Sequence, residues 1–276
     1  MSFSINVNES ALNALRQLSG TNRELAETQT HINTGLKISS AKDNAAVFSI
    51  AQKLRADLRG FNAVKQSLDR GISTTEVALA GAEAISDLLI EMKEKAVAAA
   101  DAGLDANSRN YLNQDFVALR DQINVIITNS EFNGTNLIDG GTDLVEAITS
   151  ADATELLTVA HENLTLGGGN VLISATQTIG TQTLAAATVV NIDDSIDNLN
   201  AVLTRLGAGA KGLEQNRIFA ETLADVIEVG IGNLVDADMA KESANLQALQ
   251  VKQQLGIQAL SIANQSPQSI LSLFQG

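Results

Sequence analysis

Apolar residues recur with helical spacing at both ends of the chain, and this spacing is lost in the middle. A first sevenfold series lies near the amino terminus and is followed by Gly35, a candidate helix end. Its members are Ala11, Leu18, Leu25 and Ile32. A second series runs unbroken from Ile192 to Leu234. Sevenfold repeats predict long helices that pack side by side with a left-handed supercoil.

Local signals predict where the other helices begin. The stretch Ser40-Ala41-Lys42-Asp43 fits a capping signal for a second helix that runs to about Ala100. Gly103 and Asp105 precede a third helix, and Asp236 and Asp238 are candidate caps of the last one. In the middle helices, an ordinary intramolecular bundle core would give the same apolar stripes.

The middle of the chain, from about residue 132 to Asn191, predicts a different structure. Turn signals occur at Asn133-Gly134, Gly140-Gly141 and Gly167-Gly168-Gly169. Apolar residues in Thr-rich surroundings suit short strands, namely Val171, Ile173, Ile179 and Leu184. We therefore expect a small β-containing insertion whose acidic residues face water.

The segment from Gln253 to Gly276 contains no charged side chain but many amides. A transmembrane helix must be mainly apolar, so these amides argue against insertion into a membrane. Amides are satisfied when they pack against other protein groups. We expect the segment to pack against the amino-terminal helix and against further copies of the chain.

Composition excludes several classes of function. Aromatic residues make up only 3% of the chain, which favours thin helical packing over a thick globular core, and cysteine is absent. The net charge is −14, and residues 141–200 hold eight acidic residues without one Lys or Arg. No basic stripe suits nucleic acid. The first residues lack the pattern of a secretory signal, so an exported protein would need another route.

Candidate catalytic or metal-binding residues have simpler explanations. His161-Glu162 lacks a second His at Thr165, so we expect a solvated loop histidine and not a metal site. Gly167-Gly168-Gly169 leads into an apolar stretch and suits a hairpin turn better than a phosphate loop. Asp193-Asp194 suits helix capping, and His31 suits packing at a helix boundary. We predict no enzyme activity, no metal and no cofactor.

Several blocks together resemble bacterial flagellin. The amino-terminal blocks are SINVN at 4–8, INTGLKISSAKDNAA at 32–46 and EFNGTNL at 131–137. The carboxy-terminal blocks are VDADMAKE at 235–242 and ANQSPQS at 263–269. The resemblance covers about residues 1–140 and 190–276, and the blocks occur in the same order as in the family.

The resemblance implies a mainly α fold, a long antiparallel helical coiled-coil rod formed by both chain ends, with a small β-containing insertion. It implies inner-core helices at 1–42 and 236–276, outer-core helices at 43–139 and 192–235, and a solvent-facing variable segment at 140–191. The short middle resembles minimal flagellins that lack large outer domains.

The implied function is that of a structural subunit that polymerises into the extracellular flagellar filament used for motility. A hook-filament junction protein is the alternative. The implied partners are other flagellin subunits, the flagellar type III export apparatus, an export chaperone, and the filament cap and hook-junction proteins. Export would occur without a cleaved signal peptide.

Two sets of residues follow from this view. The predicted polymerisation residues are Leu12, Leu15, Leu18, Leu25, Ile32, Leu246, Leu249, Leu260, Ile270, Leu271 and Phe274. In immunostimulatory flagellins, an Arg and a Leu are read by the vertebrate Toll-like receptor for flagellin, and Glu91 and Lys95 stand at those positions here. Charge changes of this kind weaken an interface, so we expect poor receptor activation.

Overall fold

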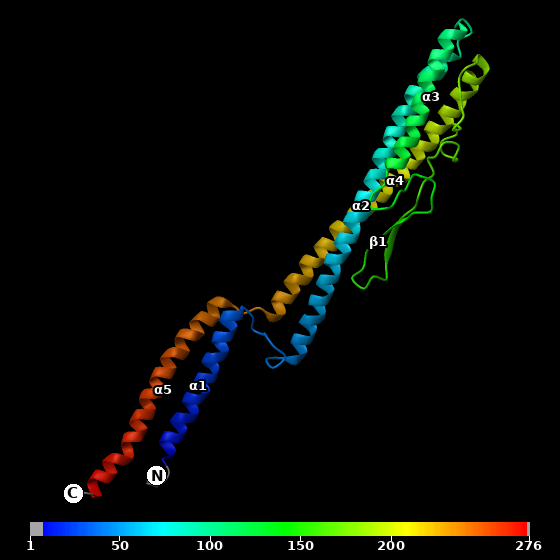
Figure 1. Ribbon diagram of the computed structural model, residues 1–276. Helices are drawn as coiled ribbons and strands as arrows, with labels where there is room; N and C mark the ends of the chain where they lie inside the picture. Colours follow the sequence, from blue (N-terminus) through cyan, green and yellow to red (C-terminus); the bar gives the residue numbers. More distant parts are fainter. Residues whose placement is uncertain (1–7, 275–276) are drawn as a thin grey trace. The chain divides into compact units, whose positions relative to one another are not determined.

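The computed structural model describes the backbone of residues 8–274 and the side chains of residues 8–265. Within that range the fold is mainly α, as predicted, with one small antiparallel sheet (Figure 1). The elements are α1 (Glu9–Thr34), α2 (Ala45–Ala99), α3 (Ala106–Asn129), β1 (Val145–Ile148), β2 (Leu156–Val159), α4 (Gln182–Val235) and α5 (Met239–Phe274).

The chain forms two compact units. One unit contains the chain up to Ala56 and again from Ile227 onward, so it holds α1 and α5. The other unit runs from Asp57 to Val226 and holds α3, the two strands and most of α2 and α4. We call them the terminal unit and the middle unit.

Helix α1 begins and ends at residues suited to those positions. The Asn8 side chain accepts a hydrogen bond from the Ala11 N–H, which satisfies a free donor of the first turn. At the other end, Gly35 takes the left-handed conformation, with φ 71°, and its N–H donates to the His31 carbonyl at 2.8 Å. The predicted helix end at Gly35 is confirmed.

The second helix begins after the stretch at residues 40–43, as predicted, but Ser40 is not its cap. Helix α2 begins at Ala45, and the Asn44 side chain accepts from the Val47 N–H at 3.1 Å. The Asp43 carboxylate instead accepts from the N–H groups of Ser39 and Ser40, both at 2.9 Å, and closes the preceding turn. These hydrogen bonds lower the pKa of Asp43. The capping residue is therefore an amide one position beyond the acid.

Helix α3 begins as predicted, directly after Asp105. The carboxylate of Asp105 accepts from the Ser108 hydroxyl and from the N–H groups of Ser108 and Asn107, and these bonds lower its pKa. Arg109 then reaches back and donates to the carbonyls of Ala99, Asp101 and Leu104. These bonds tie the start of α3 to the end of α2.

The core of the middle unit is built by α2, α3 and α4. Phe116 of α3 is fully buried, as are apolar residues of α2 and apolar residues of α4 that belong to the predicted sevenfold series from Ile192 to Leu234. Among them are Leu68, Ala82, Leu89, Ile192, Leu199, Leu206 and Leu213. Their burial within one unit agrees with an ordinary intramolecular bundle core formed by these helices.

The insertion contains strands, but not where the sequence suggested them. Strands β1 and β2 pair antiparallel with Val145 opposite Val159, whereas Val171, Ile173 and Ile179 lie outside any strand and are fully buried. Leu184 is already in α4, which begins at Gln182 and not near residue 192. The Thr-rich apolar stretch packs as an irregular segment because its apolar side chains fill the core without a sheet partner.

Three further expectations need correction. Asp193 and Asp194 lie inside α4, where Asp193 pairs with Lys93 at 2.5 Å, so they do not cap a helix. Of the two candidate caps before α5, Asp238 accepts from the N–H groups of Ala240 and Lys241. Asp236 instead forms an isolated antiparallel β-bridge with Leu36. The Gly167 turn does form, closed by the Gly167 N–H bond to Val171, but no hairpin strands flank it.

The hairpin lies against helix surfaces that glycines keep open. A Cβ atom at Gly60 of α2 would stand 2.8 Å from the Cβ atom of Ala151, and one at Gly209 of α4 would stand 3.0 Å from Val159. Contacts below 3.0 Å force a neighbour to move, and Ala151 meets Gly60 with backbone as well as side chain. Glycine is thus required at Gly60, and at Gly209 it allows close approach of the Val159 side chain.

Candidate functional site

The terminal unit pairs the two ends of the chain as antiparallel helices (Figure 1). Polar bonds fix the register along the pair. The Asn8 side chain donates to the Ala263 carbonyl, Gln253 donates to Asn22, and His31 lies 3.6 Å from Glu242. The antiparallel pairing of the chain ends predicted from the sequence is therefore confirmed.

A short bridge closes one end of this pair. The N–H groups of Lys37 and Ile38 both donate to the Val235 carbonyl, at 2.7 and 3.2 Å. In return, the Ala237 N–H donates to the Gly35 carbonyl at 2.9 Å. The turns that follow α1 and α4 are thus joined by backbone hydrogen bonds, with Gly35 in the left-handed conformation that favours glycine.

Most of the predicted apolar residues lie at the seam between α1 and α5. Leu249 is buried, with 7% of its surface exposed, and the others are half-buried. These half-buried residues are Leu18, Leu25, Ile32, Leu246 and Leu260. Gly256 allows close packing at this seam, because a Cβ atom there would lie 3.1 Å from Leu18. The pair therefore has a seam but no thick core.

Two predicted residues point away from the seam. Leu12 and Leu15 of α1 are 48% and 52% exposed. Helix α5 exposes further large apolar side chains that the sequence reading did not select. They are Met239, Val251, Ile257 and Ile262, together with Leu255 of the uncharged segment. The predicted residues Ile270, Leu271 and Phe274 lie outside the described side chains.

The sequence contains a signal for these exposed residues, because apolar positions of α5 also occur outside the predicted stripe. A sevenfold series selects one stripe of a helix, whereas α5 carries apolar residues on more than one side. A helix that is apolar on several sides is normally surrounded by other protein. In the terminal unit, α1 and α5 cover each other on one side only, so their outer faces form a contiguous candidate interface.

The chemistry expected of an active site is not assembled in the described residues. His161 is exposed, and the Glu162 carboxylate beside it receives Arg205 through two bonds of 2.6 and 2.7 Å. That ion pair raises the pKa of Arg205. Within residues 8–274 no group of three or more acidic or His side chains converges as a metal site, and no helix is apolar enough over a sufficient length to cross a membrane.

The two receptor-recognition positions lie on the surface of α2. Glu91 is exposed, and the half-buried Lys95 lies 3.8 Å from Glu94. Glu91 therefore presents its negative charge to solvent, whereas Lys95 is partly covered. The weak receptor activation inferred from the sequence remains a prediction.

Comparison with known proteins identifies the family. The bacterial flagellin N-terminal helical region matches residues 5–143, and the flagellin C-terminal helical region matches residues 189–274. Flagellin FljM of Caulobacter vibrioides is 48% identical over 272 residues, which cover 99% of this chain and 98% of that protein.

Two solved structures share the fold. Bacillus cereus flagellin matches with a TM-score of 0.50 at 20% identity, over 55% of this chain and 87% of that one. A putative flagellar hook-associated protein from Vibrio parahaemolyticus matches with a TM-score of 0.59 at 14% identity, over 70% of this chain and 100% of that one. At these identities the two structures support the fold alone. The two family regions and the full-length relative show that the chain belongs to the bacterial flagellin family.

Proposed function

We propose that this flagellin polymerises through the outer faces of its paired terminal helices. Flagellins are structural subunits of the extracellular flagellar filament, and the chain is therefore a filament subunit and not an enzyme. The observation that carries the proposal is the double role of α1 and α5. Each helix offers one apolar side to the seam and leaves large apolar residues such as Leu15 and Leu255 exposed.

Energetics support assembly as the way to cover these residues. Burying one large aliphatic side chain contributes about 1.5–3 kcal/mol, and a pair of helices in water cannot bury both of its sides. Neighbouring copies supply apolar surface of the same kind. The uncharged segment from Gln253 onward fits such a site because its amides find partners among other helices without leaving a charge unpaired.

The same reasoning assigns roles to the parts of the chain. We assign 1–42 and 236–276 to the inner core of the filament, and 43–139 and 192–235 to its outer core. The middle unit has a core of fully buried residues of its own, which suits a self-contained outer layer. The 140–191 segment would face solvent with one side only, because Val145, Val159 and Ile173 are buried against the helices.

The partners follow from membership of the family. The main partners are other copies of the same chain, which together form a homopolymer. We extend the proposal to the flagellar type III export apparatus, an export chaperone, and the filament cap and hook-junction proteins, with export that needs no cleaved signal peptide. The alternative of a hook-filament junction protein has less support, because the full-length match at 48% identity is to a flagellin.

Truncation tests the proposal. Removal of Ser261 to Gly276 deletes the end of α5 but leaves the middle unit intact. We expect a soluble, helical monomer that does not elongate filament seeds, measured by sedimentation and electron microscopy. The full chain should form long filaments under the same conditions, whereas a junction protein would form short rings. Filaments of normal length from the truncated chain would refute the proposed role of the tail.

A further inference from the structure

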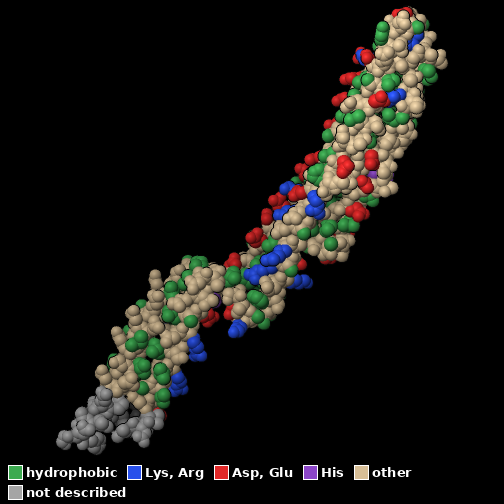
Figure 2. All heavy atoms as spheres, viewed as in Figure 1, with side chains coloured by type: hydrophobic (Ala, Val, Ile, Leu, Met, Phe, Trp, Pro, Cys, Tyr) green, Lys and Arg blue, Asp and Glu red, His purple; other side chains and the backbone are tan. Residues whose placement is uncertain are grey.

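Helix α2 carries an exposed row of acidic side chains on the surface of the middle unit. We call Glu76, Glu83, Asp87 and Glu94 the acidic row. Their spacings of seven, four and seven residues place them on one helix face. All four are exposed, and in the described part of the chain only Glu94 has an ion-pair partner, Lys95 at 3.8 Å. Figure 2 shows acidic side chains along this edge of α2.

A second patch on the same helix has the opposite charge. Arg59 and Arg70 lie eleven residues apart, close to three helical turns, so they share one face. Both are exposed, and neither forms an ion pair with any described residue. We call them the arginine pair.

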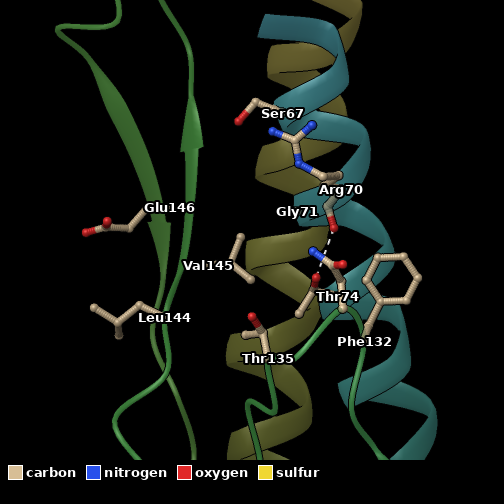
Figure 3. A pocket seen from close by; sticks show the side chains of 10 residues that line it. Ser67, Arg70, Gly71, Thr74, Phe132, Thr135, Leu144, Val145 and Glu146 are labelled. Atoms are coloured by element: carbon tan, nitrogen blue, oxygen red, sulfur yellow. Dashed lines mark hydrogen bonds between the residues drawn. The ribbon is translucent and has the colours of Figure 1, made fainter. Parts of the chain in front are cut away.

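Arg70 also lines a shallow groove between α2, the turn at residues 132–135 and strand β1. The groove contains the Ser67 and Thr135 side chains and the start of β1. Figure 3 shows that Glu146, which also lines the groove, points away from Arg70. The guanidinium is therefore left free to meet a carboxylate that arrives from outside the chain.

Several cations of the middle unit are paired within the chain, as in Arg217 with Asp69, Arg205 with Glu162 and Lys93 with Asp193, whereas the arginine pair is not. A chain with a net charge of −14 repels its own copies, and a row of unpaired carboxylates adds to this repulsion. A neighbouring copy that presents cations to the row would remove the penalty.

We infer that the acidic row of one subunit docks against the arginine pair of a second copy of this chain. The inference rests on the proposed function and adds a defined contact between outer-core surfaces. The centres of the two patches are about 20 residues apart, which is about 30 Å along a helix that rises about 1.5 Å per residue. Two parallel copies would therefore meet with an axial offset of about 30 Å.

The contact has the symmetry that a filament requires. The two patches are different parts of the same chain, so each copy uses one patch on one neighbour and the other patch on the next. Such a heterologous contact does not close into a dimer and instead propagates. Exposed ion pairs contribute only about 0.2–1 kcal/mol each, so the contact sets the register between subunits while the terminal helices supply most of the affinity.

Charge reversal and charge exchange test this contact. One variant carries Arg59→Glu and Arg70→Glu, and a second carries Glu83→Lys and Asp87→Lys. We expect each to elongate wild-type seeds at least about tenfold more slowly than wild type, because like charges then face each other. The variant with all four substitutions keeps the net charge of −14, and we expect it to polymerise by itself at nearly the wild-type rate. Circular dichroism of each monomer verifies folding.

A crosslink provides a second measurement that does not depend on altered charge. The chain contains no cysteine, so Arg70→Cys and Asp87→Cys introduce single thiols. In mixed filaments of the two variants, a short bis-maleimide should join position 70 of one subunit to position 87 of another. A control with Tyr111→Cys in place of Asp87→Cys, at an exposed position on α3, should give no such product.

The outcomes separate this inference from the proposed function. If wild type polymerises and both double variants polymerise equally fast, the contact is refuted and the filament role stands. Failure of the four-substitution variant to recover, with a folded monomer, also refutes the contact, as does absence of the 70–87 crosslink. If wild type itself does not elongate on seeds, the proposed function fails.

Discussion

Leu12 and Leu15 allow a prediction that separates folding of the monomer from assembly of the filament. They are 48% and 52% exposed in the terminal unit, so about half of each side chain has no cover within one subunit. Full burial of a leucine contributes about 1.5–3 kcal/mol, so assembly should recover about 1 kcal/mol from each residue. The substitutions Leu12→Ala and Leu15→Ala together should therefore weaken each subunit's addition by about 2 kcal/mol.

That loss corresponds to a rise of about thirtyfold in the critical concentration for polymerisation, since about 1.4 kcal/mol is a factor of ten. The assay is sedimentation of seeded filaments over a range of subunit concentrations. The helical content of the monomer should stay unchanged, because neither residue lies at the seam. A matched control carries Leu156→Ala and Leu184→Ala, which are similarly exposed but lie in the middle unit.

The refuting result is specific. If the Leu12/Leu15 variant polymerises at the wild-type critical concentration, the outer face of α1 does not contact another subunit. If the control variant loses as much as the test variant, exposed leucines matter in general and the assignment to the terminal helices fails.

The middle unit yields the remaining predictions. Phe116→Ala should destabilise it by about 3–5 kcal/mol in thermal unfolding, because the ring is fully buried and its removal leaves a cavity. Gly60→Leu should lower the melting temperature more than Gly207→Leu, since only Gly60 meets Ala151. Asp105 has a lowered pKa, so its capping contribution should persist at neutral pH and fade as pH falls through that lowered pKa. Acid titration should show that the difference in unfolding free energy between wild type and Asp105→Ala narrows below about pH 4.

The sequence predicted the helices well where apolar spacing and caps agree. Gly35 and Asp105 mark helix limits through chemistry that acts within a few residues, so local reading suffices. The start of α2 after residue 43 was predicted, but its cap was missed because Asp43 and Asn44 compete for that role, and only the backbone path shows that Asn44 faces the free N–H groups.

The insertion was less predictable because its structure depends on what it packs against. Ile173 and Ile179 have the composition of strand residues, yet they fill gaps between helices without a sheet partner. Likewise, the sevenfold stripe identified the seam of the terminal pair but not Val251 or Ile262 on the outer side. Which face of α5 stays exposed depends on how α5 pairs with α1, and a single apolar stripe in the sequence does not show this.

The glycine contacts of the hairpin also bear on the engineering of filaments. Because Gly60 and Gly209 leave room for Ala151 and Val159, exchanging the hairpin for an unrelated sequence would leave gaps or clashes beneath it. The turn between the strands shares this constraint at Ala151 but not at its tip. Residues 152–154 are exposed, and Ala153 already has a φ of 58°. A foreign peptide inserted at this tip would leave Ala151 in contact with Gly60, so the tip is the place to display a peptide in every subunit of a filament.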